Sequence, residues 1–235
     1  DVGMSIETGD EFNFTMGYDI EYDDIESVEI ISEKTVYDGS NYKDTGIKLF
    51  DEDKDFVLAV DYKMSSENNA DATLLQCFQT SGSNGFKLKC NSSIMPEFAW
   101  GSSNIIPSAA DSREMIVIRH KKGDNNLYVY TSNLDSSNYS EFTIEKTTST
   151  QSNIATLVFG AAKQDSGRFT NHAVGEINWC KVWYKDLGDD ICKKLVGWTH
   201  EQINLEVSGF YRYQLKDDNT KESMVSLLAS HLLEN

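Results

Sequence analysis

The sequence contains no apolar run long enough to span a membrane. Its longest apolar runs, such as Phe56–Val60 and Met115–Ile118, are well short of the ~20 residues that a transmembrane helix needs. We therefore expect no membrane insertion. The chain begins at Asp1 without a basic or apolar leader, so we expect it to be a piece of a longer or processed protein.

Basic residues are scarce. Lys and Arg total 21 against 38 Asp and Glu, which gives a formal net charge of −17. Such a surface repels phosphate backbones and anionic lipids, and this argues against nucleic acid and membranes as partners. The same charge is compatible with neutral sugars, cationic partners or bound cations, or it serves solubility alone.

Cysteine motifs are lacking as well. The four cysteines contain no C-x-x-C pair and have no histidine at zinc-ligand spacing. A disulfide between Cys77 and Cys90 is one interpretation, if their strands are neighbours. Free buried thiols are the other, and we favour them because a chain of 235 residues can build a core that needs no covalent staples.

Short β-type runs are what the sequence does contain, each bounded by Gly, Asn, Asp or Ser clusters. The predicted strands are Ile25–Ile31, Gly46–Phe50, Phe56–Met64, Leu74–Gln79, Gly85–Lys89, Glu97–Trp100, Met115–His120, Leu127–Thr131, Ala155–Gly160 and Ile177–Tyr184. Because no long helical pattern separates these strands, they predict an all-β fold of two antiparallel sheets packed face to face.

Helical patterns are confined to the C-terminal part of the chain. Gly188–Val196 has acidic residues in its first turn and lysines in its last, and Glu222–Leu233 has an apolar stripe. Between them, Asn204–Leu215 is typical of a hairpin. We therefore expect a β-sandwich over residues 1–197 and a C-terminal hairpin-plus-helix extension, residues 198–235, packed on it.

Four motifs, in their order along the chain, resemble those of concanavalin A-like and laminin-G-like jelly rolls. Phe56–Tyr62 resembles an early strand, Arg113–Asn133 their central hairpin, and Thr156–Gly160 the strand that follows. Gly175–Leu187 is similar to their closing strand and the helical turn after it. The resemblance spans about residues 46–197 and implies a two-sheet antiparallel β-sandwich; it does not specify a ligand.

Domains of this kind also occur in phage tail and receptor-binding proteins. The acidic, Ser/Asn-rich sequence with its C-terminal tail is similar to those proteins. This analogy implies an extracellular or virion-surface location, with a homo-oligomer or a larger virion assembly as the setting. No heptad pattern in the sequence encodes an oligomer.

One segment matches a catalytic motif of the same superfamily. Glu21, Asp23 and Glu26 have the E-x-D-x-x-E spacing of laminarinase-type glycoside hydrolases, in which two carboxylates flank the glycosidic bond. We discount the match because it precedes the family-like core, whereas in those enzymes it lies mid-chain, and because the surrounding segment is rich in acidic residues. No G-x-S-x-G nucleophile motif is present either. We predict a non-catalytic domain.

The closing strand provides the first candidates for ligand binding. The resemblance marks as core-facing the positions Ile177, Cys180 and Val182. The other face then carries Trp179, Lys181 and Trp183, which could form a stacking platform for sugar rings. The alternative is that the extension 198–235 covers both tryptophans as a second small core, because large aromatic residues are usually buried.

Further candidates lie on other strands and loops. Tyr128 and Tyr130 alternate with apolar residues and are expected to point outward. Trp100 stands at a strand end beside a loop, a common place for a binding aromatic, with a lid over the core as its alternative. Asn104 and Arg168 lie on predicted loops and could supply hydrogen bonds.

The resemblance also allows a structural calcium ion in a loop. The acidic clusters are Asp51–Asp55 and Asp38–Asn41, and neither has the spacing of an EF-hand loop. Charge runs of this kind are usually solvated turns. We predict no other cofactor.

Three functions therefore stay open. The first is a lectin-like module that binds a cell-surface glycan, as the receptor-binding part of a phage tail or as a surface adhesin. The second is a structural or assembly domain of a virion or surface protein with no glycan ligand. The third is a glycoside hydrolase using Glu21 and Glu26. Accessibility of Trp179, Trp183 and Trp100 separates the first two, because a sugar platform must be reachable.

Overall fold

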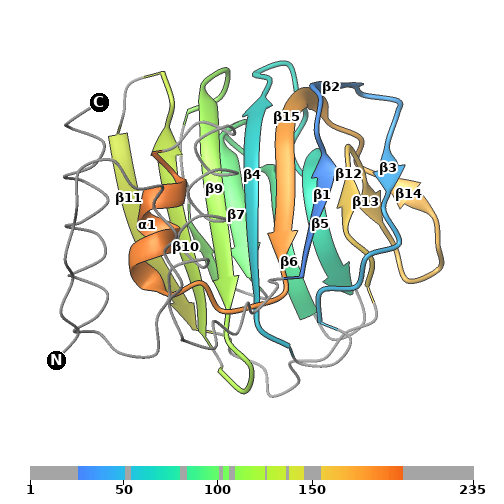
Figure 1. Cartoon of the computed structure of the whole chain (residues 1–235). Helices are drawn as coiled ribbons and strands as arrows, with labels where there is room; N and C mark the ends of the chain where they lie inside the picture. The colour runs from blue at the N-terminus through green and yellow to red at the C-terminus, as the bar shows by residue number, and fades with distance from the viewer. Residues whose placement is uncertain are drawn as a thin grey trace, which may run out of the picture. The chain divides into compact units, whose positions relative to one another are not determined.

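Two antiparallel β-sheets with one short helix form the part of the chain that the structure describes (Figure 1). In this computed structural model the described residues are 26–50, 54–79, 84–100, 103–105, 109–124, 126–135, 138–145 and 155–197. No helix among them is long and apolar enough to cross a bilayer. The predicted extension 198–235 lies outside these residues, as does Glu21.

The larger sheet has seven strands. They are β1 (Ser27–Ile31), β2 (Thr35–Asp38), β4 (Phe56–Met64), β9 (Arg113–His120), β10 (Asn126–Asn133), β11 (Asn138–Glu145) and β15 (Val174–Trp183). Their order is β1-β15-β4-β9-β10-β11, with β2 pairing with the first part of β15 and β1 with its second part. The sheet thus has its earliest and latest described strands side by side, as a jelly roll requires.

The smaller sheet has six strands. They are β3 (Lys43–Asp44), β5 (Thr73–Gln79), β6 (Asn84–Cys90), β7 (Pro96–Trp100), β8 (Ser103–Ile105) and β12 (Val158–Phe159). Their order is β3-β12-β5-β6-β7-β8. A separate hairpin of β13 (Ala162–Lys163) and β14 (Phe169–Thr170) follows β12, and a parallel bridge between Thr73 and His172 ties the chain after this hairpin to β5.

The main core lies between the two sheets and is built by alternation along their strands. Phe56, Leu58 and Val60 of β4 point into it from the larger sheet. Phe86 and Leu88 of β6 point into it from the smaller sheet. Because successive side chains of a strand face opposite ways, the residues between these positions belong to the outer faces of the sandwich.

A β-bulge on the closing strand explains its irregular pattern of core positions. The pairing of β15 with β4 shifts between Ile177 and Trp179, so one extra residue, Asn178, is inserted there. The shift brings Ile177 and Cys180 to the same side although three positions separate them, and both belong to the inter-sheet core. The predicted core-facing set is thereby confirmed.

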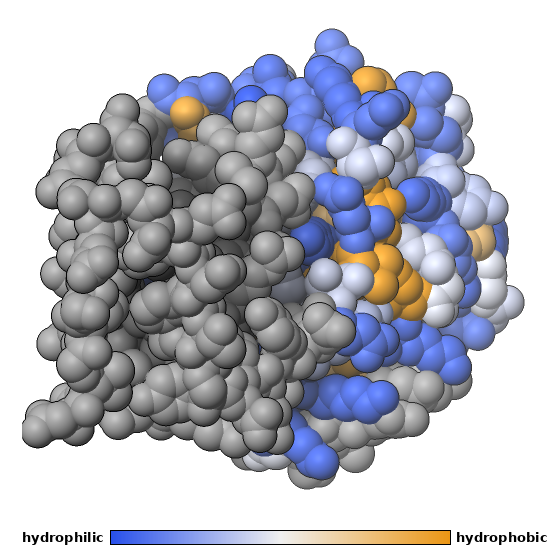
Figure 2. Space-filling view, viewed as in Figure 1, coloured by the Kyte–Doolittle hydropathy of each residue, from blue (hydrophilic) through white to orange (hydrophobic). Residues whose placement is uncertain are grey.

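The outer face of the larger sheet carries the single described helix. Helix α1 (Asp189–Leu195) lies in front of β10 and β11 (Figure 1), contacts β9 and buries Ile191, Cys192 and Leu195. Where Figure 2 shows described residues on this side of the molecule, they are mostly hydrophilic and surround a small hydrophobic patch.

The predicted all-β sandwich, its central hairpin and the helix after the closing strand are confirmed. Nine of the ten predicted strands correspond to observed ones. The prediction of a strand at Gly46–Phe50 is wrong: this segment is an irregular turn, and Leu49 and Phe50 reach the core from it. The all-β pattern missed β11 and the short strands β2, β3, β8, β13 and β14.

The four cysteines are free and buried, as the preferred interpretation held. Cys77 lies opposite Phe86 and Cys90 lies opposite Pro96, so the two thiols are at different levels of the smaller sheet. Burial raises the pKa of Cys77 to about 12 and that of Cys90 to about 11. Thiols of this kind are protonated at neutral pH and unreactive.

Candidate functional site

The tryptophans of the closing strand lie on the outer face of the larger sheet, as predicted, but they are not open to solvent. Trp179 is 1% exposed and Trp183 is 2% exposed. The Trp179 indole donates a hydrogen bond of 2.6 Å to Glu29 Oε1, and the Lys181 ammonium lies 5.4 Å from the centre of the Trp183 ring. A reachable stacking platform is therefore not formed by these residues.

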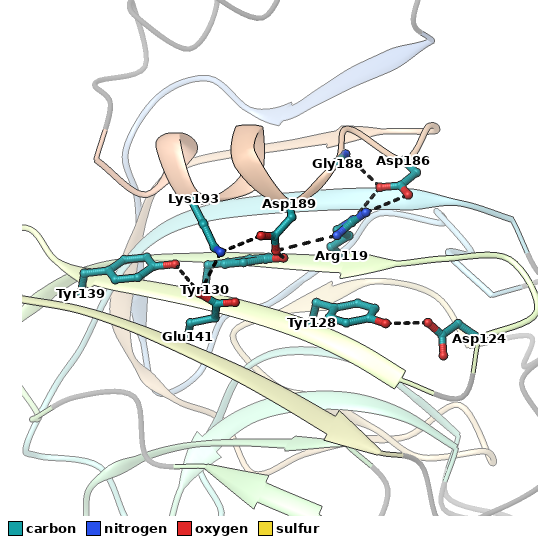
Figure 3. Close-up of polar contacts among 10 residues, drawn as sticks. All are labelled: Arg119, Asp124, Tyr128, Tyr130, Tyr139, Glu141, Asp186, Gly188, Asp189 and Lys193. Atoms are coloured by element: carbon teal, nitrogen blue, oxygen red, sulfur yellow. Dashed lines mark hydrogen bonds and ion pairs between the residues drawn. The ribbon is translucent and has the colours of Figure 1, made fainter.

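The two candidate tyrosines of β10 share that outer face and are held by local contacts. Tyr130 is buried, and its hydroxyl donates a hydrogen bond of 2.5 Å to Asp189 of helix α1. Tyr128 donates one of 2.8 Å to Asp124, in the turn before its own strand. Figure 3 shows Tyr130 pointing toward the helix and Tyr128 pointing toward the turn.

Arg119 connects the same region to the segment before α1. Its guanidinium binds both carboxylate oxygens of Asp186, at 2.5 and 2.9 Å, and Asp186 in turn accepts a hydrogen bond from the Gly188 backbone amide (Figure 3). Lys193 of α1 pairs with Asp189 and with Glu141 of β11. These contacts fix the helix to the sheet, so this face has a structural role.

Trp100 belongs to the core between the sheets. It is 1% exposed, lies opposite Phe86 and packs on Phe50 with ring centres 5.3 Å apart. Its indole is directed inward because Trp100 alternates with Ala99 along β7. Of the two interpretations of Trp100, an aromatic side chain that covers the core fits this position. An exposed platform for a ligand does not.

The outer face of the smaller sheet, in contrast, is hollowed. Two hollows of about 100 and 210 Å³ share four lining residues, Gln76, Phe78, Lys163 and Gln164. We call them together the lysine groove. Its combined volume approaches the lower end of the ~300–1,000 Å³ range of small-molecule sites, which suits a single sugar ring better than a long polymer.

The floor of the lysine groove follows from strand alternation. Phe86, Leu88 and Cys90 of β6 enter the core, so Lys87 and Lys89 between them point outward. Cross-strand register then places Gln76 on one side of Lys87 and Ala99 on the other.

One wall of the groove is the β13–β14 hairpin, and specific hydrogen bonds attach it to the sheet. The Gln76 side-chain amide donates to the Lys163 carbonyl at 2.9 Å, and the Thr73 backbone amide donates to the Asn171 carbonyl at 2.8 Å. The Lys163 ammonium reaches Asp44 at 2.6 Å. The wall is thus fixed at three points and does not depend on a ligand for its position.

Two residues at the rim hold the left-handed backbone conformation. Asp71 has φ 66° and Asn171 has φ 52°, and both line the smaller hollow. Asp and Asn are the side chains that tolerate this region best after glycine, because their short polar groups hydrogen-bond locally. The Asp71 carboxylate is directed to Lys89 at 2.6 Å.

The three lysines of the groove differ in their partners. Lys89 pairs with Asp71 and lies 3.7 Å from Glu97; burial opposes its charge, but these carboxylates raise its pKa. Lys163 pairs with Asp44. Lys87 lies over the Phe78 ring at 4.7 Å, and burial, together with the charge of Lys89, lowers its pKa.

The last two candidate residues lie on the side of the smaller sheet. Asn104 is exposed on β8 and stands opposite Ala99, so it shares the outer face and the cross-strand row of Lys87 and Gln76. Arg168 is exposed in the β13–β14 turn, whose residues Asp165 and Gly167 line the larger hollow. The eight predicted ligand residues are therefore divided between two sheets and the core, and they do not form one site.

The sequence-based search missed the lysines of the groove, although a signal for them existed. The segment Phe86–Cys90 alternates strictly between apolar and lysine residues, which places two cations on one face of a strand in a chain with few cations. What the pattern could not reveal is the hairpin, 70 residues away in the sequence, that turns this face into a groove.

No group of three or more His, Cys, Asp or Glu side chains that could hold a metal ion occurs in the described residues. In the predicted calcium loop Asp38–Asn41, the Asp38 carboxylate accepts hydrogen bonds from Ser40 and Asn41 and so closes its own turn. Most of Asp51–Asp55 lies outside the described residues. Glu26 is exposed directly before β1, and its proposed catalytic partner Glu21 is not described.

The sequence matches no protein family and no curated protein. Solved structures do match its fold. The NanB sialidase of Streptococcus pneumoniae matches with 13% identity and a TM-score of 0.51, over 71% of this chain and 28% of the sialidase. An arabinofuranosidase complexed with arabinofuranosyl-α-1,2-xylobiose matches with 8% identity and a TM-score of 0.51, over 70% of this chain and 39% of that one.

The CBM40 domain of the Ruminococcus gnavus IT-sialidase, bound to α2,6-sialyllactose, matches with 16% identity and a TM-score of 0.48, over 73% of this chain and 97% of that domain. The chain has a jelly-roll β-sandwich fold, as its sheet order shows and as the two matches with a TM-score of 0.51 support. The predicted two-sheet antiparallel sandwich is confirmed. In the sialidase and the arabinofuranosidase the matched part is a minor share of the chain, so the similarity is one of fold and not of whole enzymes.

Proposed function

We propose that this chain is a non-catalytic carbohydrate-binding domain that acts outside cells and holds its ligand in the lysine groove. The observation that carries the proposal is the groove itself, a hollow on the outer face of the smaller sheet. Its lining combines an aromatic ring, Phe78, with the side-chain amides of Gln76, Gln164 and Asn171. Sugar binding needs this combination, because rings stack on aromatic faces and hydroxyls pair with amides.

The cellular setting of this function is a cell surface or a virion surface. The order of the jelly-roll motifs and the acidic, Ser/Asn-rich sequence support a receptor-binding role of the kind found in phage tails. A net charge of −17 fits such a surface and disfavours nucleic acid as a competing ligand.

A structural or assembly domain is the second candidate. The observation that favours it is the burial of Trp179 and Trp183 on the outer face of the larger sheet, since a surface built for sugars would leave its tryptophans reachable. In that case the groove would be a surface irregularity without a ligand.

The test is binding of the full chain to a panel of cell-surface glycans, with Phe78→Ala as the groove variant. We expect the variant to lose binding by about fivefold or more, because stacking on an aromatic ring contributes about 1 kcal/mol or more. Tyr139→Ala is the matched control, since Tyr139 is an aromatic residue that is 46% exposed on β11 of the other sheet. Absence of binding to every glycan by folded protein would reject this function in favour of the assembly domain.

A further inference from the structure

One cation in the lysine groove, Lys87, has no anionic partner among the residues that the structure describes. Its ammonium makes no hydrogen bond or ion pair with any of them and lies over the Phe78 ring, 4.7 Å from the ring centre. The other two lysines of the groove are paired at 2.6 Å, Lys89 with Asp71 and Lys163 with Asp44. An ammonium group has three donors, and the face of one ring satisfies only part of them.

The surroundings of Lys87 leave its charge uncompensated. It is half-buried at the centre of the sheet, between Gln76 of β5 and Ala99 of β7. Asp71 and Glu97 favour its charged form from a distance, yet burial and the charge of Lys89 outweigh them, so the pKa of Lys87 is lowered. A half-buried cation of this kind gains free energy when an anion enters the groove and pairs with it.

The shape and the remaining charge of the molecule limit what that anion can be. The smaller hollow, in which Lys87 lies, has a volume of about 100 Å³, and besides Phe78 and Ala162 its lining is polar and includes the side-chain amides of Gln76, Gln164 and Asn171. Neutral amides of this kind pair with hydroxyls. The protein as a whole carries −17, so it repels polyanions such as nucleic acids and densely sulfated chains. An isolated negative charge among hydroxyls is the chemistry that fits.

We propose that the lysine groove selects glycans with a singly charged acidic sugar, and that Lys87 receives the anionic group of that sugar. The anionic group is a carboxylate or a single sulfate ester, since an ammonium accepts either as a point charge. This assignment rests on the proposed carbohydrate-binding function and adds to it the class of ligand and the residue that reads the charge.

The experiment measures binding of the full chain to four small probes by isothermal titration calorimetry. The probes are the methyl glycosides of N-acetylneuraminic acid and glucuronic acid, galactose 6-sulfate, and neutral methyl galactoside. Lys87→Gln removes the charge and keeps the stem, and Lys87→Arg restores the charge. Lys122→Gln is the matched control, because Lys122 is exposed in the β9–β10 turn of the other sheet.

We expect the acidic probes to bind at least tenfold more tightly than the neutral one. Lys87→Gln should abolish this preference, because a hydrogen bond between charged groups is stronger than its neutral counterpart by about this factor. Lys87→Arg should keep most of it, and Lys122→Gln should bind like the unchanged protein. Whichever of the carboxylate and sulfate probes binds with the higher affinity identifies the anionic group that the groove prefers.

Three results would overturn the assignment. Equal affinity for acidic and neutral probes would refute charge selection while leaving carbohydrate binding intact. Acidic preference that survives Lys87→Gln would place the anion elsewhere. Absence of binding to any probe or any glycan would remove the proposed function as well. Thermal unfolding of each variant checks its fold, and the ¹³C-methyl NMR signal of reductively methylated Lys87 in the unmutated chain reports the contact if a variant does not fold.

Discussion

The ion pair between Arg119 and Asp186 provides a direct test of how helix α1 is held. The Arg119 side chain is 6% exposed and that of Asp186 is 29% exposed, with two hydrogen bonds between them. Replacing Arg119 by Met keeps the apolar stem and removes the charge. Asp186 is left half-buried with the Gly188 backbone amide as a remaining donor.

The expected cost follows from this geometry. Removing one partner of a fully buried pair costs about 3–5 kcal/mol, because the other charge stays buried without compensation. Asp186 is partly solvated, so we expect Arg119→Met to lower the free energy of unfolding by about 2–3 kcal/mol. The matched control is Lys34→Met, which breaks the exposed pair of Lys34 with Glu176 and should cost less than about 1 kcal/mol.

The cost should also depend on pH. Burial raises the pKa of Asp186, but hydrogen bonds from Arg119 and Gly188 outweigh it and the net pKa is lowered from 3.8. A carboxyl group whose pKa is lower in the folded than in the unfolded state stabilises the fold at pH values above its unfolded-state pKa. This contribution is lost as the pH falls through its folded-state pKa. The difference between the unchanged chain and Arg119→Met should therefore be constant above about pH 5 and shrink below pH 4.

Urea unfolding followed by tryptophan fluorescence at pH 7, 5 and 3.5 measures these quantities. A loss for Arg119→Met no larger than that for Lys34→Met would refute the argument that the Arg119–Asp186 pair anchors α1. A difference that stays constant down to pH 3 would refute the pKa assignment of Asp186 and leave the anchor itself in place.

Two further predictions concern the buried thiols and a crowded glycine. The four thiols should not react with a disulfide reagent such as DTNB in the native chain and should all react in denaturant, because burial raises their pKa values; rapid labelling of even one native thiol would contradict the described core. Gly85→Ala should destabilise the fold by more than about 2 kcal/mol, because its φ of +103° disfavours a side chain and an added Cβ would lie 2.0 Å from the Cys77 carbonyl oxygen. Gly123→Ala, also at positive φ but in open space, should cost about 1 kcal/mol, and equal losses for the two would show that crowding at Cys77 is absent.

The strands predicted best from the sequence are those that the apolar residues within the strand itself are enough to identify. Phe56–Met64 was placed with its full length because a short run rich in aromatic and β-branched residues between polar turns favours a buried strand, and β4 occupies these residues. Asn138–Glu145 was missed because it is the edge strand of its sheet, where exposure lets polar residues replace the apolar alternation. Gly46–Phe50 was misplaced because a short apolar run is equally compatible with a turn that inserts Leu49 and Phe50 into the core.

The candidate site was harder to predict because two long-range contacts determine it. The choice of outer face depends on α1, which Asp186 and Asp189 attach to Arg119 and Tyr130 across more than 50 residues of sequence. The predicted tyrosines and tryptophans lay on the face that this helix region occupies. Alternation along a strand gives the two faces of a sheet, but it does not say which face another part of the chain will cover.

Two of the three lysines in the groove are paired with carboxylates, and the third, Lys87, bears on the proposed function. One outer face of the sandwich carries α1, and on the outer face of the smaller sheet the Lys87 ammonium makes no ion pair with a described residue. Stability alone does not explain this arrangement, since an uncharged side chain at position 87 would avoid the cost of burying a charge. The carboxylates of Asp71 and Asp44 pair instead with Lys89 and Lys163, so Lys87 is the lysine of the groove that the proposed anionic ligand would pair with.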